Sequence, residues 1–97
     1  MSSLEHVKNI MLTIRPYLVS NYAISDLYIF GSYAREEQTD SSDLDILVDF
    51  TKTPDLLTFL EIEEYMSKKL HLDVDLVPKR KLKKQIKNQI LDEAIVV

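Results

Sequence analysis

Two pairs of aspartates, each pair spaced two residues apart, are the part of this sequence best suited to chemistry. The first pair is Asp43 and Asp45. Apolar residues occupy the alternate positions that follow the first aspartate: Leu44, Ile46, Val48 and Phe50. Because strand side chains alternate between faces, this pattern predicts a strand with one core face and one acidic face. Aspartate is depleted in strands, so these acids indicate a function rather than a local preference.

The second pair, Asp73 and Asp75, alternates with Leu72, Val74 and Leu76 in the same way. Neighbouring strands lie about 4.8 Å apart, so carboxylates from both strands can converge on one site. Such crowded acids repel one another when ionised, and cations stabilise them. Ligands that are all oxygen favour magnesium or manganese over zinc, and the spacing suits a pair of divalent ions.

Gly31 is the only glycine in the chain, and it lies between the apolar residues 27–30 and Ser32. We expect a strand to end here and a short helix to begin over residues 33–36, which would expose backbone amides that suit a phosphate. An ordinary strand-to-helix turn capped by Ser32 also fits these two residues taken alone. Arg35, one helical turn further on, is placed either to contact a phosphate or to pair with a surface glutamate.

Composition narrows the class of protein. The 97 residues predict one small domain over residues 1–97, and the net charge of −4 argues against broad nucleic-acid binding. Without cysteine, disulfides and thiolate metal sites are excluded, which fits a cytoplasmic protein. We expect no signal peptide and no membrane span. The basic residues within 79–87 are read as a solvated face, with an RNA or acidic partner surface as the alternative.

The remaining pattern predicts an α/β (α+β) fold, a small mixed sheet of three to four strands flanked by helices. A first helix is expected from a capping box of Ser2 and Glu5, kinked or restarted at Pro16. Residues 27–30 read as a central strand, 72–77 as a third strand, and 95–97 as a short edge strand.

Two further helices are expected. One begins with Thr53 as N-cap and Pro54 at the first position, and runs to about Lys69. The buried stripe predicted for this helix is Leu56, Leu57, Phe59, Leu60, Ile62, Met66 and Leu70, with Glu61, Glu63 and Glu64 facing water. The last helix is marked by Leu82, Ile86 and Ile90 and ends near Ala94.

The succession of Gly31-Ser32, residues 33–42, Asp43-Leu44-Asp45 and later Val74-Asp75-Leu76-Val77 resembles the polymerase-beta-type nucleotidyltransferase superfamily. The short length resembles its minimal branch, the antitoxin half of HEPN/MNT toxin–antitoxin pairs. This resemblance implies the minimal nucleotidyltransferase fold. It also implies that Gly31 and Ser32 bind the triphosphate of ATP, while Asp43, Asp45 and Asp75 are catalytic and hold two Mg²⁺ ions. Asp75 is favoured over Asp73, and the chain departs from the family pattern at Glu36, where many members have glycine.

The same resemblance implies transfer of AMP from ATP to a hydroxyl group, a tyrosine, of a HEPN ribonuclease toxin. The expected partners are therefore the toxin and ATP, with no membrane and no direct nucleic-acid contact. Three alternatives stay open: an antitoxin that acts only by binding, nucleotidyl transfer to a small molecule, and the metal motif of a glycosyltransferase.

Overall fold

The computed structural model describes residues 3–97 and shows a four-stranded sheet with helices on both sides. The strands are β1 (Ile24–Phe30), β2 (Leu44–Phe50), β3 (Val74–Pro78) and β4 (Ile95–Val96), in the order β3-β2-β1-β4. β2 and β3 are parallel, and the other neighbours are antiparallel. The mixed sheet, the interior position of β1 and the short edge strand at the C-terminal end are confirmed.

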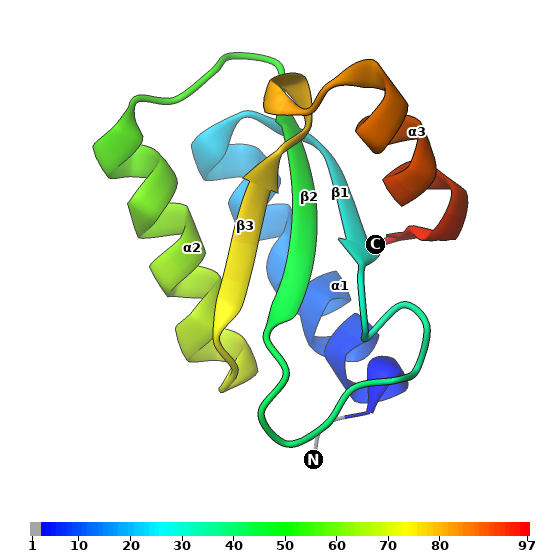
Figure 1. Ribbon diagram of the computed structural model, residues 1–97. Coiled ribbons are helices and arrows are strands. Elements are labelled where there is room, and N and C mark those ends of the chain that lie inside the picture. Colours follow the sequence, from blue (N-terminus) through cyan, green and yellow to red (C-terminus); the bar gives the residue numbers. More distant parts are fainter. Residues whose placement is uncertain (1–2) are drawn as a thin grey trace.

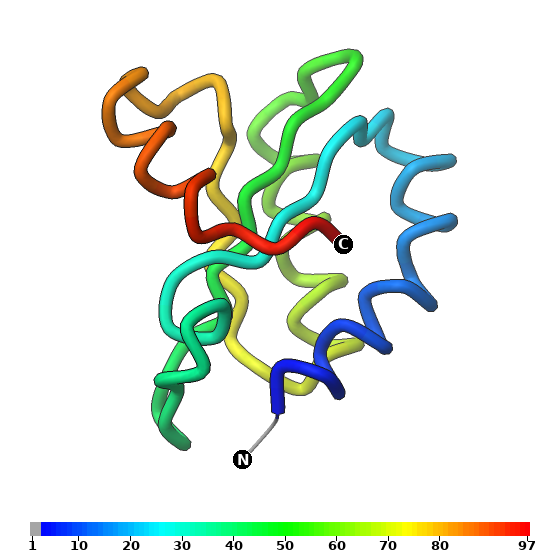
Figure 2. The backbone as a smooth tube through the Cα atoms, turned by 90° about the vertical axis from the view of Figure 1, so that its right-hand side faces the viewer, coloured from blue at the N-terminus to red at the C-terminus, as the bar shows by residue number. Residues whose placement is uncertain are grey.

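Figures 1 and 2 show that α1 (Leu4–Tyr22) and α2 (Leu56–Leu70) cover one face of the sheet. On the other side lie α3 (Lys84–Glu93), shown in orange and red, and the segment between β1 and β2. A short 3₁₀ helix, η1 (Lys79–Lys81), connects β3 to α3. Leu82, expected in the last helix, lies between η1 and α3, and that helix is capped at its end by Ala94.

Helix α1 begins at Ser3, whose side chain accepts a hydrogen bond from the His6 amide at 3.1 Å. The expected cap, Ser2, lies outside the described residues. The helix continues through Pro16 without interruption, so it does not restart there, and a kink at Pro16 stays a prediction. Four buried residues distributed along the helix hold it against the sheet despite the missing donor: Val7, Met11, Ile14 and Leu18.

Helix α2 differs from the expectation at its start and along its stripe. Asp55, not Thr53, is the N-cap, and its carboxylate accepts the Thr58 amide at 2.8 Å, which lowers the pKa of Asp55. Ile62, Met66 and Leu70 are buried as expected. The predicted stripe is nevertheless too broad, because the leucines of the first turns, Leu56, Leu57 and Leu60, are exposed.

Strand β2 buries Leu44, Ile46, Val48 and Phe50 in the main core, as the alternation predicts. Leu47, between Asp45 and Asp49, is also fully buried, although it lies on the acidic face and outside the main core cluster. The acidic face is therefore partly covered, because η1 and α3 lie on that side. Among residues 3–97, no helix combines the length and apolar character needed to cross a membrane.

Candidate active site

The segment after β1 is a series of hydrogen-bonded turns over residues 31–36, so the predicted short helix is wrong. The Arg35 amide donates to the Gly31 carbonyl at 3.2 Å, and the Glu37 amide donates to the Ser32 carbonyl at 2.9 Å. Glu36 has a φ of 56°, in the left-handed region. This conformation ends the helical geometry, and it is the one that glycine adopts at no steric cost.

Gly31 is required by its contact with the first aspartate pair. Its φ is 73°, and a Cβ placed on it would collide with Oδ2 of Asp45 and lie 3.1 Å from Cγ of the same residue. The register explains the contact, because Phe30 at the end of β1 pairs with Asp45 on β2. The glycine turn and the acidic face of β2, which are separate motifs in the sequence, therefore touch in space.

The two aspartate pairs also meet. Asp45 on β2 and Asp75 on β3 are register partners in neighbouring parallel strands, and Asp43 lies just before β2. Asp75 is exposed and does not enter the hydrophobic core, whereas Asp45 is half-buried. Burial raises the pKa of Asp45, and the charges of Asp75 and Asp43 raise it further, while Arg35 lowers it.

The carboxylate oxygens of the site suit a hard cation, although the side chains are not arranged around a common point. In the part of the chain that the structure describes, no three His, Cys, Asp or Glu side chains stand in an arrangement that could hold a metal ion. Asp43, Asp45 and Asp75 nevertheless offer carboxylate oxygens from neighbouring backbone positions, and after burial the charges of Asp75 and Asp43 help to raise the pKa of Asp45. These residues fit Mg²⁺ chemically, and their role as ligands stays a prediction.

Arg35 is held by two glutamates. Its Nε donates to Glu37 Oε1 at 2.8 Å, and its Nη1 donates to Glu93 Oε1 at the end of α3 at 3.0 Å. The pairing with a nearby surface glutamate is thus observed for Glu37, whereas the contact with Glu93 was missed. Contact with a phosphate stays a prediction, and it would require the phosphate to compete with these two carboxylates.

Strand β3, which carries Asp75, is fixed by side chains of α2 that the sequence analysis did not identify. Glu63 Oε2 accepts the Leu76 amide at 2.9 Å, so Glu63 does not simply face water. Ser67 Oγ accepts the Val74 amide at 3.1 Å. β3 is an edge strand, and these two residues satisfy amides that would otherwise lack a ladder partner.

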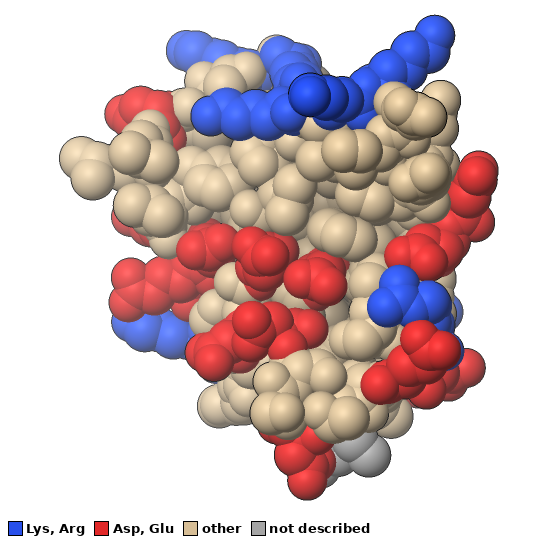
Figure 3. All heavy atoms as spheres, viewed as in Figure 1, with Lys and Arg blue, Asp and Glu red and all other residues tan. Residues whose placement is uncertain are grey.

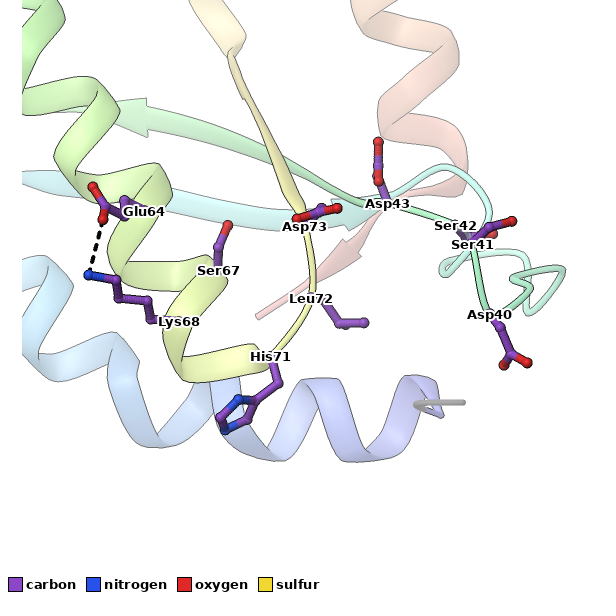
Figure 4. A pocket seen from close by; sticks show the side chains of 10 residues that line it. All are labelled: Asp40, Ser41, Ser42, Asp43, Glu64, Ser67, Lys68, His71, Leu72 and Asp73. Atoms are coloured by element: carbon purple, nitrogen blue, oxygen red, sulfur yellow. Dashed lines mark ion pairs between the residues drawn. The ribbon is translucent and has the colours of Figure 1, made fainter.

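An open hollow of about 430 Å³ lies beside the acids, between the loop before β2 and the end of α2 (Figure 4). Asp43 and Asp73 line it, with Asp40 and His71 further out. In Figure 4, Asp43 and Asp40 point to opposite sides of their loop. The backbone carbonyl of Asp73 accepts the Leu44 amide at 2.9 Å, which gives this residue a structural role.

In this mixed sheet a glycine turn touches an aspartate of one strand, and a second aspartate lies beside it on the neighbouring strand. This arrangement is the core of a nucleotidyltransferase. The family model described as "Polymerase beta, Nucleotidyltransferase" matches residues 13–97. The chain belongs to this family and is a nucleotidyltransferase. The protein adenylyltransferase MntA of Thermococcus cleftensis is 41% identical over 97 residues, covering 100% of this chain and 98% of the relative.

Solved structures show the same fold. A minimal nucleotidyltransferase superimposes with a TM-score of 0.85 at 30% identity, covering 99% of this chain and 97% of the other. A toxin–antitoxin structure with AMP-PNP has a TM-score of 0.76 at 28% identity, covering 92% and 70%. A Shewanella oneidensis structure of a tri-AMPylated HEPN toxin in complex with MNT antitoxin has a TM-score of 0.69 at 25% identity, covering 93% and 70%.

Proposed function

We propose that this protein is the antitoxin of a HEPN/MNT pair, transferring AMP from ATP to a tyrosine hydroxyl of a HEPN toxin and thereby neutralising it. The observation that carries the proposal is the meeting of Gly31, Asp45 and Asp75 at one place on the sheet. The name of the MntA relative and the AMPylated toxin in the Shewanella oneidensis complex support the same reaction.

In this proposal each residue of the site has a distinct role. The turn at Gly31 and Ser32 receives the triphosphate, with the Ser32 hydroxyl donating to a phosphate oxygen. Asp43, Asp45 and Asp75 would hold Mg²⁺, which would neutralise phosphate charge and make the acceptor hydroxyl more acidic. The acceptor oxygen bonds to the α-phosphorus while the bond from that phosphorus to the bridging oxygen breaks. Pyrophosphate leaves, and the hydroxyl proton passes to the Asp75 carboxylate.

The partner has to supply the acceptor side of the site. We infer that residues 1–97 form one nucleotidyltransferase domain. The hollow beside its acids is open rather than enclosed. A small acceptor would find little concave surface here, whereas a protein can bring its own. This favours a protein acceptor over a small molecule.

Transfer can be tested with the purified protein, α-labelled ATP, Mg²⁺ and the HEPN-domain toxin encoded beside its gene. We expect the label on a toxin tyrosine, and loss of labelling by at least a hundredfold in the Asp43→Asn, Asp45→Asn double variant. The matched control is Asp26→Asn, because Asp26 lies near the start of β1, away from Gly31 at the other end of that strand. An unlabelled toxin that is still inhibited would refute transfer.

A second candidate is an antitoxin that only binds its partner. It is favoured by the exposed leucines of α2, Leu56, Leu57 and Leu60, which offer a binding surface that needs no chemistry. The same double variant separates the two functions. Neutralisation by the variant that equals that of the wild type would show that the chemistry is dispensable.

A further inference from the structure

The first two turns of α2 expose a cluster of leucines. Leu56, Leu57 and Leu60 are 71%, 79% and 48% exposed. Residues three and four apart are neighbours on a helix surface, so the three side chains form one continuous apolar patch. Single exposed apolar residues are ordinary, but a contiguous patch indicates an interaction surface.

The patch borders a groove of about 340 Å³ at the end of the sheet where β2 and β3 finish. Leu56 and Phe59 of α2 form one wall, and Val48, Phe50 and Pro78 of the sheet face them. Phe50 and Phe59 lie edge to face, with their ring centroids 6.4 Å apart. The groove is therefore apolar, and its size suits one large side chain of a partner.

Arg80 makes the groove rigid. Its guanidinium donates to Asp49 Oδ1 at 3.0 Å, to Thr53 Oγ1 at 3.1 Å and to the Phe50 carbonyl at 2.6 Å. These bonds tie η1 to the end of β2 and to the loop that leads into α2. A groove with fixed walls loses little entropy when a partner fills it.

The rim of the groove is basic. Half of the twelve Lys and Arg residues lie within residues 79–87, which contain no Asp or Glu. Lys81 lines the groove and forms no ion pair within residues 3–97. Figure 3 shows these charges gathered along the upper edge, an uncharged area beneath them, and acidic side chains lower on the same face.

We propose that this groove and its basic rim dock an acidic segment of the HEPN toxin, one that inserts a large apolar side chain beside Leu56. The identity of the partner rests on the function proposed above, whereas the apolar and acidic character of the segment follows from the groove. RNA fits less well, because apolar side chains such as Leu56 and Phe59 line the groove where the phosphates of RNA would need cations.

The docking groove is separate from the acids. Phe50 lies five residues beyond Asp45 on β2, and at about 3.4 Å per residue this separation is about 17 Å. A bound segment would thus hold the toxin while leaving the acids free to meet its hydroxyl. Docking of this kind acts on the affinity for the toxin and not on the transfer step.

The test compares a Leu56→Glu, Leu60→Glu double variant with Leu12→Glu, which alters a leucine of α1 that is 58% exposed. Glutamate near the start of α2 is compatible with the helix dipole, so the double variant should fold, which its melting curve checks. We expect the Kd for the toxin, measured without ATP, to rise at least tenfold in the double variant and to stay unchanged in Leu12→Glu. Lys81→Glu should weaken binding severalfold, with a smaller dependence on salt.

The KM for the toxin should rise by the same factor as the Kd, while kcat stays unchanged. Equal affinity of the wild type and the leucine variant would overturn the proposal, as would a toxin that does not bind the wild type. Binding of a single-stranded RNA that depends on Lys81 but not on the leucines would also overturn it, in favour of a nucleic-acid edge. If toxin binding depends on the leucines but no AMP is transferred, only the proposed reaction is refuted. If AMP is transferred at the same rate and with the same KM in the leucine variant, only the docking groove is refuted.

Discussion

The Asp45 carboxyl group is half-buried against Gly31, with the charges of Asp43 and Asp75 nearby. Burial and these two charges raise the pKa of Asp45, so the ionised carboxylate is less stable in the folded protein than in the unfolded chain. This residue therefore destabilises the fold at neutral pH in the absence of a cation. The same negative charge would attract a cation bound beside Asp45 and so strengthen the binding of that cation.

Replacing Asp45 with asparagine should raise the melting temperature by a few degrees in metal-free buffer at neutral pH, because it removes the unfavourable charge. The control variant Asp49→Asn should lower the melting temperature, since Asp49 pairs with Arg80 at 3.0 Å. Differential scanning fluorimetry of the three proteins measures both changes. A lower melting temperature for both variants would show that the charge of Asp45 does not destabilise the fold.

At the residue scale, alternation along the sequence was enough to predict that Asp45 and Asp75 lie on strands with one apolar and one acidic face, because strand geometry is local and regular. That the two strands are neighbours was implied by the family resemblance, and their register confirms it. Their role as metal ligands stays a prediction. The contact of Arg35 with Glu93 could not be predicted, since 58 residues separate them and no local pattern specifies that α3 returns to this turn. The left-handed backbone of Glu36 had a detectable signal, because the family resemblance implies a glycine at this position, and glycine adopts that conformation readily.

At the element scale, the order and type of the main helices and strands follow from periodicity, whereas their boundaries and exposure do not. Thr53 and Asp55 are both good caps, but Asp55 caps the helix while the Thr53 hydroxyl accepts a hydrogen bond from Arg80. Periodicity also placed Leu56 and Leu57 in the buried stripe, which was wrong because both side chains are exposed. Exposure depends on the neighbouring layer, which the pattern of one helix does not contain.

A contact between α1 and α2 gives the fold a defined dependence on alkaline pH. The Tyr22 hydroxyl donates to Glu61 Oε2 at 3.1 Å, and burial together with Tyr17 and Glu61 raises the pKa of Tyr22 from 10.0 to about 12. The unfolded chain therefore loses this proton at lower pH than the folded protein does. The stability contributed by Tyr22 is fully present below pH 10 and is lost as the pH rises from 10 to about 12.

Urea unfolding of the wild type and of Tyr22→Phe between pH 9 and pH 11.5 isolates this effect, because lysines titrate equally in both proteins. We expect the free energy of unfolding of the wild type to fall more steeply than that of the variant above pH 10. Parallel curves would mean that Tyr22 titrates as it does in the unfolded chain.

At the scale of the whole molecule, the sheet separates two functions along its length. Acids gather where β2 and β3 begin, and bases gather where they end (Figure 3). The opposite charges lie at opposite ends of the same two strands, so a partner of mixed charge would bind in one orientation. The family was predictable from the sequence because the spacing of Gly31, Asp43, Asp45 and Asp75 reflects the whole topology, whereas the docking groove required coordinates.

The whole-molecule consequence of the acidic site is coupling between ligand binding and folding. Mg²⁺ with ATP, at a hundredfold excess over the dissociation constant, should raise the free energy of unfolding by about 2.7 kcal/mol. For a domain of this size each kcal/mol shifts the melting temperature by roughly 4–8 °C, so the combined shift should exceed about 10 °C. Either ligand alone should give a much smaller shift, because the triphosphate and the carboxylates repel without the cation. Asp45→Asn should abolish the shift while Leu56→Glu keeps it, and a melting temperature that stays constant across the titration would contradict a working nucleotide site.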